Sequence, residues 1–316
     1  MHAIEINKLT KNYGKARGIT ELDLNVEVGD IFGFIGPNGA GKSTTIRTLL
    51  GLIHPTSGEA KVLGYDITRD QTKILSETGY LPSEVSFYSG MKVREVIAYS
   101  ARLRKKKCDG KAKMLCERLD LDLDRKVDDL SLGNRKKVGI VTALQHSPRL
   151  LILDEPTSGL DPLVQREFFE IIKEENARGA TVFLSSHVLS EVQHHCKTAA
   201  FIRDGRILMH DAVSNLEGAG ARRVLVIGDV EPSKISGATD IEKNGERVSF
   251  LYQGDPTQLL SILSQQKIRD IQITEPSLED IFMRFYEGCA PAPAPAEARA
   301  PQASAPSNEE KGGAEK

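Results

Sequence analysis

The chain has 316 residues, of which 40% are hydrophobic and 27% are charged, and its formal net charge at pH 7 is -2. This composition is that of a globular protein with one or two domains, and the small net charge gives no reason to expect a nucleic-acid partner. No apolar run approaches the ~20 residues that span a bilayer, and the first residues lack a signal-peptide core, so we expect the chain to stay inside the cell and outside the membrane.

The first segments predict two kinds of strand. Apolar residues alternate with polar ones in two early stretches, at Ile4, Ile6 and Leu9 and again at Leu22, Leu24, Val26 and Val28. This period of two predicts half-buried, antiparallel strands. Ile31–Ile35 is instead continuously apolar, as in a strand covered on both faces, and a glycine-rich loop and a helix over about Lys42–Leu52 follow it.

The middle of the chain predicts a helical segment and then a parallel sheet. Residues from about 85 to 146 form a charged segment with a helical pattern. Two apolar strands follow, Leu150–Leu153 and Thr181–Leu184, with a helix over about Pro162–Arg178 between them. This β–α–β order predicts parallel core strands. A hairpin that turns at Asp204–Gly205 comes next.

The character of the sequence changes after Gly218–Gly220. The elements expected there are three strands and two helices: Arg222–Ile227, Val248–Tyr252, Gln258–Gln266 (helix), Ile268–Thr274 and a closing helix from Ser277. We therefore expect a main domain over residues 1–217 and a small α+β domain over about 221–287. Residues 290–316 are rich in Ala and Pro without apolar periodicity, which predicts a disordered tail.

Four cysteines are scattered without the spacing of a metal site, and we expect reduced thiols. The cluster His194–His195–Cys196 could suggest a metal site. Adjacent residues on a helix do not converge on one point, however, so the sequence disfavours a metal there.

A complete phosphate-binding loop lies between the buried strand and the following helix. The segment GPNGAGKST matches G-x-x-x-x-G-K-[ST] and consists of Gly36, Pro37, Asn38, Gly39, Ala40, Gly41, Lys42, Ser43 and Thr44. Its glycines allow backbone N–H groups to surround a phosphate at a helix N-terminus. We expect Lys42 to reach the β- and γ-phosphates, Ser43 to hold Mg²⁺, and Thr44 to support the α-phosphate.

Three further polar residues follow predicted strands. Asp154 and Glu155 end the strand Leu150–Leu153, where one carboxylate can hold Mg²⁺ and the next can accept a proton from an attacking water. His187 follows the strand Thr181–Leu184. Because the carboxyl ends of parallel strands gather beside the phosphate loop, we expect His187 to approach the γ-phosphate.

A short Ser–x–Gly turn, Ser131–Gly133, stands 23 residues before Asp154. With these motifs in order, residues 3–217 resemble the nucleotide-binding subunit of an ABC transporter. The resemblance implies an α/β fold: a P-loop NTPase core with a mixed, mainly parallel sheet, an antiparallel β subdomain and an inserted helical subdomain, followed here by the small C-terminal α+β domain. It also implies that ATP and Mg²⁺ are the cofactors.

The resemblance implies roles for individual residues. In this family two ATPase domains sandwich two ATP molecules head to tail, so Ser131 and Gly133 would contact the γ-phosphate held by a second copy of the chain. Glu155 would be the general base, and His187 would position the γ-phosphate and the water. Asp161, in the loop SGLD, would lie at the dimer seam, and Tyr13 would stack on adenine or remain an ordinary surface tyrosine.

The chain departs from the family pattern in two places. The signature, commonly LSGGQ, reads LSLGN, with Leu132 and Asn134 as the exchanged residues. The family also carries a glutamine that links Mg²⁺ to the membrane partner, and Ser83 stands at that position with Glu84 next to it. The Ser83 side chain is too short both to bind Mg²⁺ and to reach the membrane partner, which leaves Glu84 as the candidate substitute.

The segments GYLP and TSGLDP and the closing PSLEDIFMRFY resemble a bacterial exporter branch in which a separately encoded integral membrane permease is the partner. The permease would dock near Tyr80–Ala98 and hold the chain peripherally on the cytoplasmic side of the cell membrane. Two alternatives remain: an ABC ATPase that acts on ribosomes or DNA, and a regulatory or binding subunit with weak or no hydrolysis. The small domain could bind a regulator, widen the dimer contact or stabilise the core.

Overall fold

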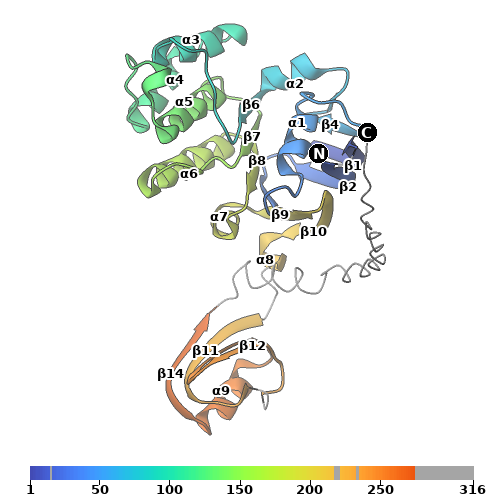
Figure 1. Cartoon of the computed structure of the whole chain (residues 1–316), viewed down its shortest axis with the longest axis vertical. Coiled ribbons are helices and arrows are strands. Elements are labelled where there is room, and N and C mark those ends of the chain that lie inside the picture. The colour runs from blue at the N-terminus through green and yellow to red at the C-terminus, as the bar shows by residue number, and fades with distance from the viewer. Residues whose placement is uncertain (15, 217–220, 233–234, 275–316) are drawn as a thin grey trace, which may run out of the picture.

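The computed structural model describes residues 1–14, 16–216, 221–232 and 235–274, and Figure 1 shows the arrangement of its elements. The described strands form three sheets: one of four strands in the order β2-β1-β4-β5, one of six in the order β10-β9-β3-β8-β7-β6, and one of four in the order β12-β13-β11-β14. The six-stranded sheet positions the candidate site. The phosphate loop and the acidic residues lie at the carboxyl ends of its interior strands.

The first sheet contains the two strands that alternation predicted. Strands β1 (His2–Tyr13) and β2 (Ala16–Glu27) pair antiparallel, with Ile6 opposite Leu24 and Leu9 opposite Leu22. Strands β4 (Ser57–Val62) and β5 (Tyr65–Asp66) extend this sheet. These two short strands were not predicted, since the exposed half of β4 carries no apolar pattern.

The central sheet confirms the predicted parallel core. Its parallel strands are β3 (Ile31–Ile35), β8 (Thr181–Ser186), β7 (Leu150–Asp154), β6 (Thr78–Leu81) and β9 (Thr198–Arg203), and β10 (Arg206–Ala212) returns antiparallel beside β9. Every residue of β3, β7 and β8 is buried, as their continuous apolar sequences predicted. The predicted turn at Asp204–Gly205 is present, with both residues at positive φ.

Each face of the central sheet packs on a different layer (Figure 1). On one face, Phe32, Phe34 and Phe183 pack with the first sheet and with α1 (Lys42–Leu49) in one apolar cluster. The other face packs on helices, whose bounds are α5 (Leu132–Leu144), α6 (Pro162–Ala177) and α7 (Leu189–His195). The short helices α2 (Gln71–Glu77) and α8 (Val213–Leu216) complete this part of the chain.

The predicted helical segment over about 85–146 contains α3 (Val93–Leu103), α4 (Asp109–Arg118), a 3₁₀ turn (Val127–Asp129) and α5. These helices share their buried side chains with the helical face of the central sheet. None of the described helices is long and apolar enough to cross a membrane.

The third sheet is formed by residues that follow α8 in the chain. Its elements are β11 (Ala221–Asp229), β12 (Ala238–Asn244), β13 (Arg247–Gln253), α9 (Pro256–Ser264) and β14 (Lys267–Thr274). Strand β12 was not predicted, because nearly all of its residues are exposed and it lacks an apolar face. The predicted helix from Ser277 and the tail 290–316 lie outside the described residues, so the division into domains at 217 and over 221–287 stays a prediction.

The His194–His195–Cys196 segment forms the end of α7 and the residue after it. The His195 ring stacks on Phe169 with 3.7 Å between ring centroids, and burial lowers its pKa to about 4. Burial likewise raises the pKa of the Cys196 thiol. Within the described part of the chain no group of three potential metal ligands comes together.

Buried His146 makes the stability of the fold depend on pH. Its Nε2 lies 3.3 Å from the carbonyl oxygen of Thr78, whereas its Nδ1 is buried without a partner. A proton on Nδ1 would place an unpaired charge in the core, and burial accordingly lowers the pKa of His146 to about 3. In the unfolded chain the pKa of this imidazole is about 6.5. Between pH 6.5 and pH 3 the unfolded state therefore binds a proton that the folded state does not bind. As a result, the free energy of unfolding falls as the pH drops below 6.5.

We expect urea unfolding to show this loss. Between pH 7 and pH 5 the wild-type chain should lose about 2 kcal/mol more of its free energy of unfolding than His146→Gln, whose amide can still donate to Thr78. If the free energy of unfolding of the two proteins changes with pH in the same way, His146 is not the titrating group.

Candidate nucleotide-binding site

The phosphate loop joins β3 to α1. Gly41, at the N-cap of α1, has a φ of 111°, a conformation that glycine adopts without steric cost. Lys42 is buried, and its Nζ donates to the carbonyl oxygens of Gly36 at 2.7 Å and Pro37 at 3.3 Å. The loop thus curls around its own lysine, and the backbone N–H groups at the start of α1 are free of intrahelical partners and can bind a phosphate anion.

Asp154 lies at the end of β7 and is held by two hydroxyl groups. Ser43 Oγ donates to its Oδ2 at 2.9 Å, and Ser185 Oγ, from β8, donates to its Oδ1 at 2.5 Å. The carboxylate is buried. A hydroxyl and a carboxylate beside a phosphate site fit Mg²⁺, which binds few protein oxygens and takes its other ligands from water and nucleotide phosphates. Ser43 and Asp154 are therefore the residues that could hold this ion.

Glu155 stands between the phosphate loop and His187. One oxygen, Oε1, lies 3.3 Å from Lys42 Nζ and 3.3 Å from His187 Nδ1. Its backbone is left-handed, with a φ of 47°, a conformation that costs a non-glycine residue on the order of 1–2 kcal/mol. The Glu155 N–H donates to the carbonyl oxygen of Ser185 at 3.1 Å, which helps to hold this conformation. The geometry aims the carboxylate at the phosphate loop.

A second set of predicted residues lies around the signature turn. Ser131 is the N-cap of α5, and its Oγ accepts from the Asn134 N–H at 3.3 Å. The turn packs against the SGLD loop, since a Cβ on Gly133 would lie 2.8 Å from the carbonyl oxygen of Gly159 and a Cβ on Gly159 would lie 3.0 Å from Leu132 Cδ2. The exchanged residue Leu132 is thus a contact between these two motifs, although 61% of its surface is exposed.

Asp161 closes this second set. It is the N-cap of α6, and its Oδ1 accepts from the N–H groups of Leu163 and Val164, both at 3.1 Å. The structure therefore joins Ser131, Gly133 and Asp161 through the packing of the turn on the SGLD loop. The residues around Lys42 form a separate group at the ends of β3, β7 and β8.

Tyr13 lies at the end of β1, outside both sets. The hairpin that carries it runs beside the phosphate loop, because a Cβ on Gly41 would lie 2.9 Å from Ile19 Cγ2 and Ile19 pairs with Lys11. The ring of Tyr13 is half-exposed, with Lys11 Nζ 5.2 Å from its centroid. An aromatic face at this place can stack on a base.

Sequence reasoning missed one residue of the site, Ser185, and one residue near it, Lys136. Ser185, in LSSH, was passed over in favour of His187, although it faces Asp154 across the β7–β8 pair. Lys136 is 1% exposed, and its Nζ donates to the carbonyl oxygens of Pro82 at 3.2 Å and Ser83 at 2.8 Å. Its signal was a lysine four residues before Ile140, within the apolar face of a helix. Burial lowers the pKa of Lys136 to about 8, although the charges of Asp154 and Glu155 oppose that shift.

Comparisons with known proteins identify the family of the chain. The family model described as ABC transporter matches residues 19–158. The bacitracin transport ATP-binding protein BcrA of Bacillus licheniformis is 33% identical over 300 residues, which cover 90% of this chain and 97% of the relative. The Nod factor export ATP-binding protein I of Rhizobium etli is 31% identical over 299 residues, with 90% and 93% covered.

Solved structures show the same fold. An ATP-binding subunit of an ABC transporter superposes with a TM-score of 0.64 at 27% identity, over 68% of this chain and 92% of the other. A dimeric cassette bound to ADP and Pi, MJ0796, superposes with a TM-score of 0.60 at 21% identity, over 66% and 98%. With the phosphate loop, the acidic pair and the signature turn in place, the chain belongs to the ATP-binding subunits of ABC transporters.

Proposed function

We propose that the chain hydrolyses ATP as a pair of identical subunits and thereby drives a separately encoded permease that exports its substrate. The observation that supports this most is the hydrogen-bonded and ion-paired group of Lys42, Ser43, Asp154, Glu155 and His187 at the ends of three neighbouring strands. The similarity to the Nod factor export protein supports the direction of transport. The subunit would act at the cytoplasmic side of the cell membrane, held there by the permease.

The site residues divide the work of hydrolysis between them. The phosphate loop and Lys42 would bind the β- and γ-phosphates, while Ser43 and Asp154 would hold Mg²⁺. When bound, Mg²⁺ supplies positive charge that offsets the charge of the phosphate oxygens. Glu155 accepts a proton from the water that attacks the γ-phosphorus, and the bond from that phosphorus to the β–γ bridging oxygen breaks, which leaves ADP and phosphate. His187 orients the water and the γ-phosphate.

The second set of residues supports a site shared between two chains. Ser131 has its side chain at the exposed end of α5, where the helix N-terminus favours an anion. In the proposed dimer, Ser131 and Gly133 contact the γ-phosphate bound by the other copy, and Asp161 lies at the seam. Leu132, which occupies the place of a small residue, gives a specific reason to keep the alternative of a regulatory subunit with weak hydrolysis, and the turnover of the wild-type chain distinguishes the two.

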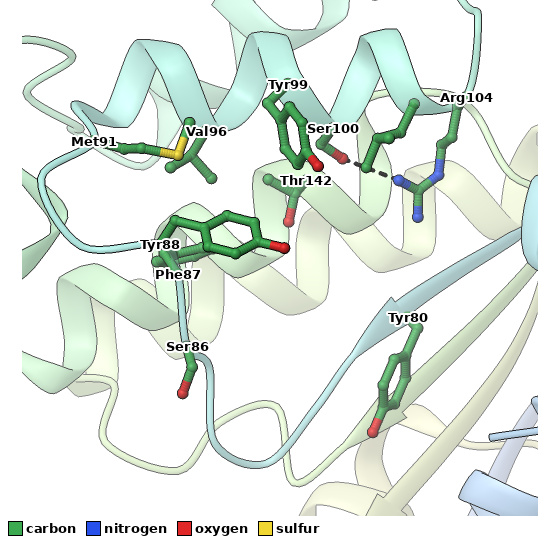
Figure 2. Close-up of a pocket in the computed structure, with 11 residues that line it drawn as sticks. Tyr80, Ser86, Phe87, Tyr88, Met91, Val96, Tyr99, Ser100, Arg104 and Thr142 are labelled. Carbon is green, nitrogen blue, oxygen red and sulfur yellow. Dashed lines mark hydrogen bonds between the residues drawn. The ribbon is translucent and has the colours of Figure 1, made fainter. Parts of the chain in front are cut away.

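A groove between α3 and the loop after β6 offers a docking site for the permease. Figure 2 shows its aromatic lining, in which Phe87 and Tyr88 come from the loop and Tyr99 comes from α3. The groove has a volume of about 480 Å³ and overlaps the predicted region Tyr80–Ala98. Tyr88 and Tyr99 meet edge to face with 6.1 Å between centroids. Such a surface suits the apolar side of a short helix.

We expect Tyr88→Asp to separate the chain from its permease. Tyr88 is 70% exposed at the rim of the groove, so the exchange should leave the fold intact but place a charge where an apolar helix docks. Recovery of permease with the tagged chain from solubilised membranes should fall by at least about tenfold, equivalent to ~1.4 kcal/mol. Val28→Asp, at an exposed position on the turn after β2, is the matched control. If Tyr88→Asp recovers as much permease as the Val28→Asp control, this groove is not the docking site.

A further inference from the structure

A buried lysine connects the signature helix to the strand beside the acidic pair. Lys136 lies on α5, five residues after Ser131, and is 1% exposed. Its ammonium group donates to the carbonyl oxygens of Pro82 and Ser83, in the loop that follows β6. A buried ammonium is unfavourable unless it is paired or hydrogen-bonded, so these contacts confine it to one place.

The partner loop is itself fixed relative to Asp154. Strand β6 pairs in parallel with β7, with Leu81 opposite Leu153, so Pro82 follows the strand pair at the level of Asp154. The negative charges of Asp154 and Glu155 favour the charged form of Lys136, against the larger effect of burial, which lowers its pKa. The lysine thus belongs to the electrostatic surroundings of the acidic pair, while its hydrogen bonds go to Pro82 and Ser83 of the neighbouring loop.

A second contact on the same face of α5 strengthens this connection. Gly139, one turn after Lys136, lies so close to the end of β6 and the loop after it that an added Cβ would be 2.8 Å from Leu81 Cδ1 and 3.0 Å from Val85 Cγ2. Residues three apart share a helix face. The helix is therefore held against residues 81–85 by close packing at Gly139 and by a charged hydrogen-bond donor at Lys136.

We propose that Lys136 is a positioning residue, which fixes the signature turn of each subunit relative to the acidic pair of the same subunit. The N-terminus of α5 carries Ser131 and Gly133, so any rotation of α5 on the central sheet displaces both. With Lys136 held by Pro82 and Ser83, closure of the dimer brings each signature turn to the partner's nucleotide in a defined orientation. In this arrangement the contribution of Ser83 is its backbone carbonyl oxygen, which accepts a hydrogen bond from Lys136, and not its side chain. This inference rests on the shared-site dimer proposed above.

The test separates assembly of the shared site from nucleotide binding in one chain. In Lys136→Met the apolar stem is retained and the donor is lost, so kcat for ATP should fall by at least about tenfold. The affinity of the single chain for ADP should change by less than about twofold, because the phosphate loop is untouched. In a Glu155→Gln background the same exchange should raise the dimer dissociation constant about tenfold.

Two further variants keep the test decisive. Lys113→Met, on the exposed face of α4, is the matched control and should behave as wild type. Lys136→Gln keeps a hydrogen-bond donor, so its kcat should lie between that of Lys136→Met and that of the wild-type chain. If Lys136→Met does not fold, Lys136→Gln is compared with the wild-type chain in its place, and its kcat should still be the lower of the two. Full kcat in Lys136→Met, or a loss of ADP affinity equal to the loss of kcat, would overturn the positioning role. Absence of turnover in the wild-type chain would instead count against the proposed function.

Discussion

Replacing Lys42 with alanine is expected to lower ATP turnover by at least about a hundredfold, the scale of losing one preorganised charge at a reacting phosphate. In the structure the Lys42 ammonium is held by the phosphate-loop carbonyls of Gly36 and Pro37 and pairs with Glu155. Alanine removes the positive charge that would meet the β- and γ-phosphates, and it removes the ammonium group that lies 3.3 Å from Glu155.

Phosphate release from the purified chain measures this effect. Lys61→Ala, at an exposed position on β4, is the matched control and should retain wild-type turnover. A Lys42→Ala protein that hydrolyses ATP within about twofold of wild type would place the reaction elsewhere on the chain.

Glu155→Gln is expected to reduce turnover by about a hundredfold or more while ATP remains bound, because glutamine has nearly the same shape but cannot accept a proton from water. The backbone of residue 155 is anchored by its N–H donating to Ser185, an interaction that the exchange retains. The loss should therefore appear in kcat, with the affinity for ATP preserved or increased. Glu170→Gln, on the exposed face of α6, is the control.

Rapid-mixing measurements of a single turnover distinguish the chemical step from product release. If Glu155→Gln cleaves bound ATP at the wild-type rate and is slow only in releasing ADP, Glu155 is not the proton acceptor, and another group such as His187 takes that role.

Much of the fold followed from the sequence where burial leaves a clear pattern. Alternation predicted β1 and β2, continuous apolar runs predicted β3, β7 and β8, and both classes are confirmed. The missed strands β4, β5, β6 and β12 are short or exposed. Strands β4, β6 and β12 form through backbone pairing with the predicted neighbours β1, β7 and β13, and β5 pairs with β4. Pairing of that kind leaves little trace in the side-chain pattern.

The candidate site shows a similar division. The phosphate loop and the residues at strand ends were predicted because parallel strands bring their carboxyl ends together. Ser185 and Lys136 were not, since their importance arises from the atoms that they face: Asp154 Oδ1 for Ser185, and two backbone carbonyl oxygens for Lys136. Contacts between a helix and a loop 53 residues away are set by packing rather than by local pattern.

The central claim is that two chains complete each nucleotide site, and the molar mass of Glu155→Gln with Mg²⁺ and saturating ATP tests it most directly. Light scattering during gel filtration should give about twice the single-chain mass with ATP and the single-chain mass with ADP. Adding Ser131→Glu, which places a negative charge at the signature turn, should keep the protein monomeric with ATP. A Glu155→Gln chain that stays monomeric at saturating ATP would contradict the shared site.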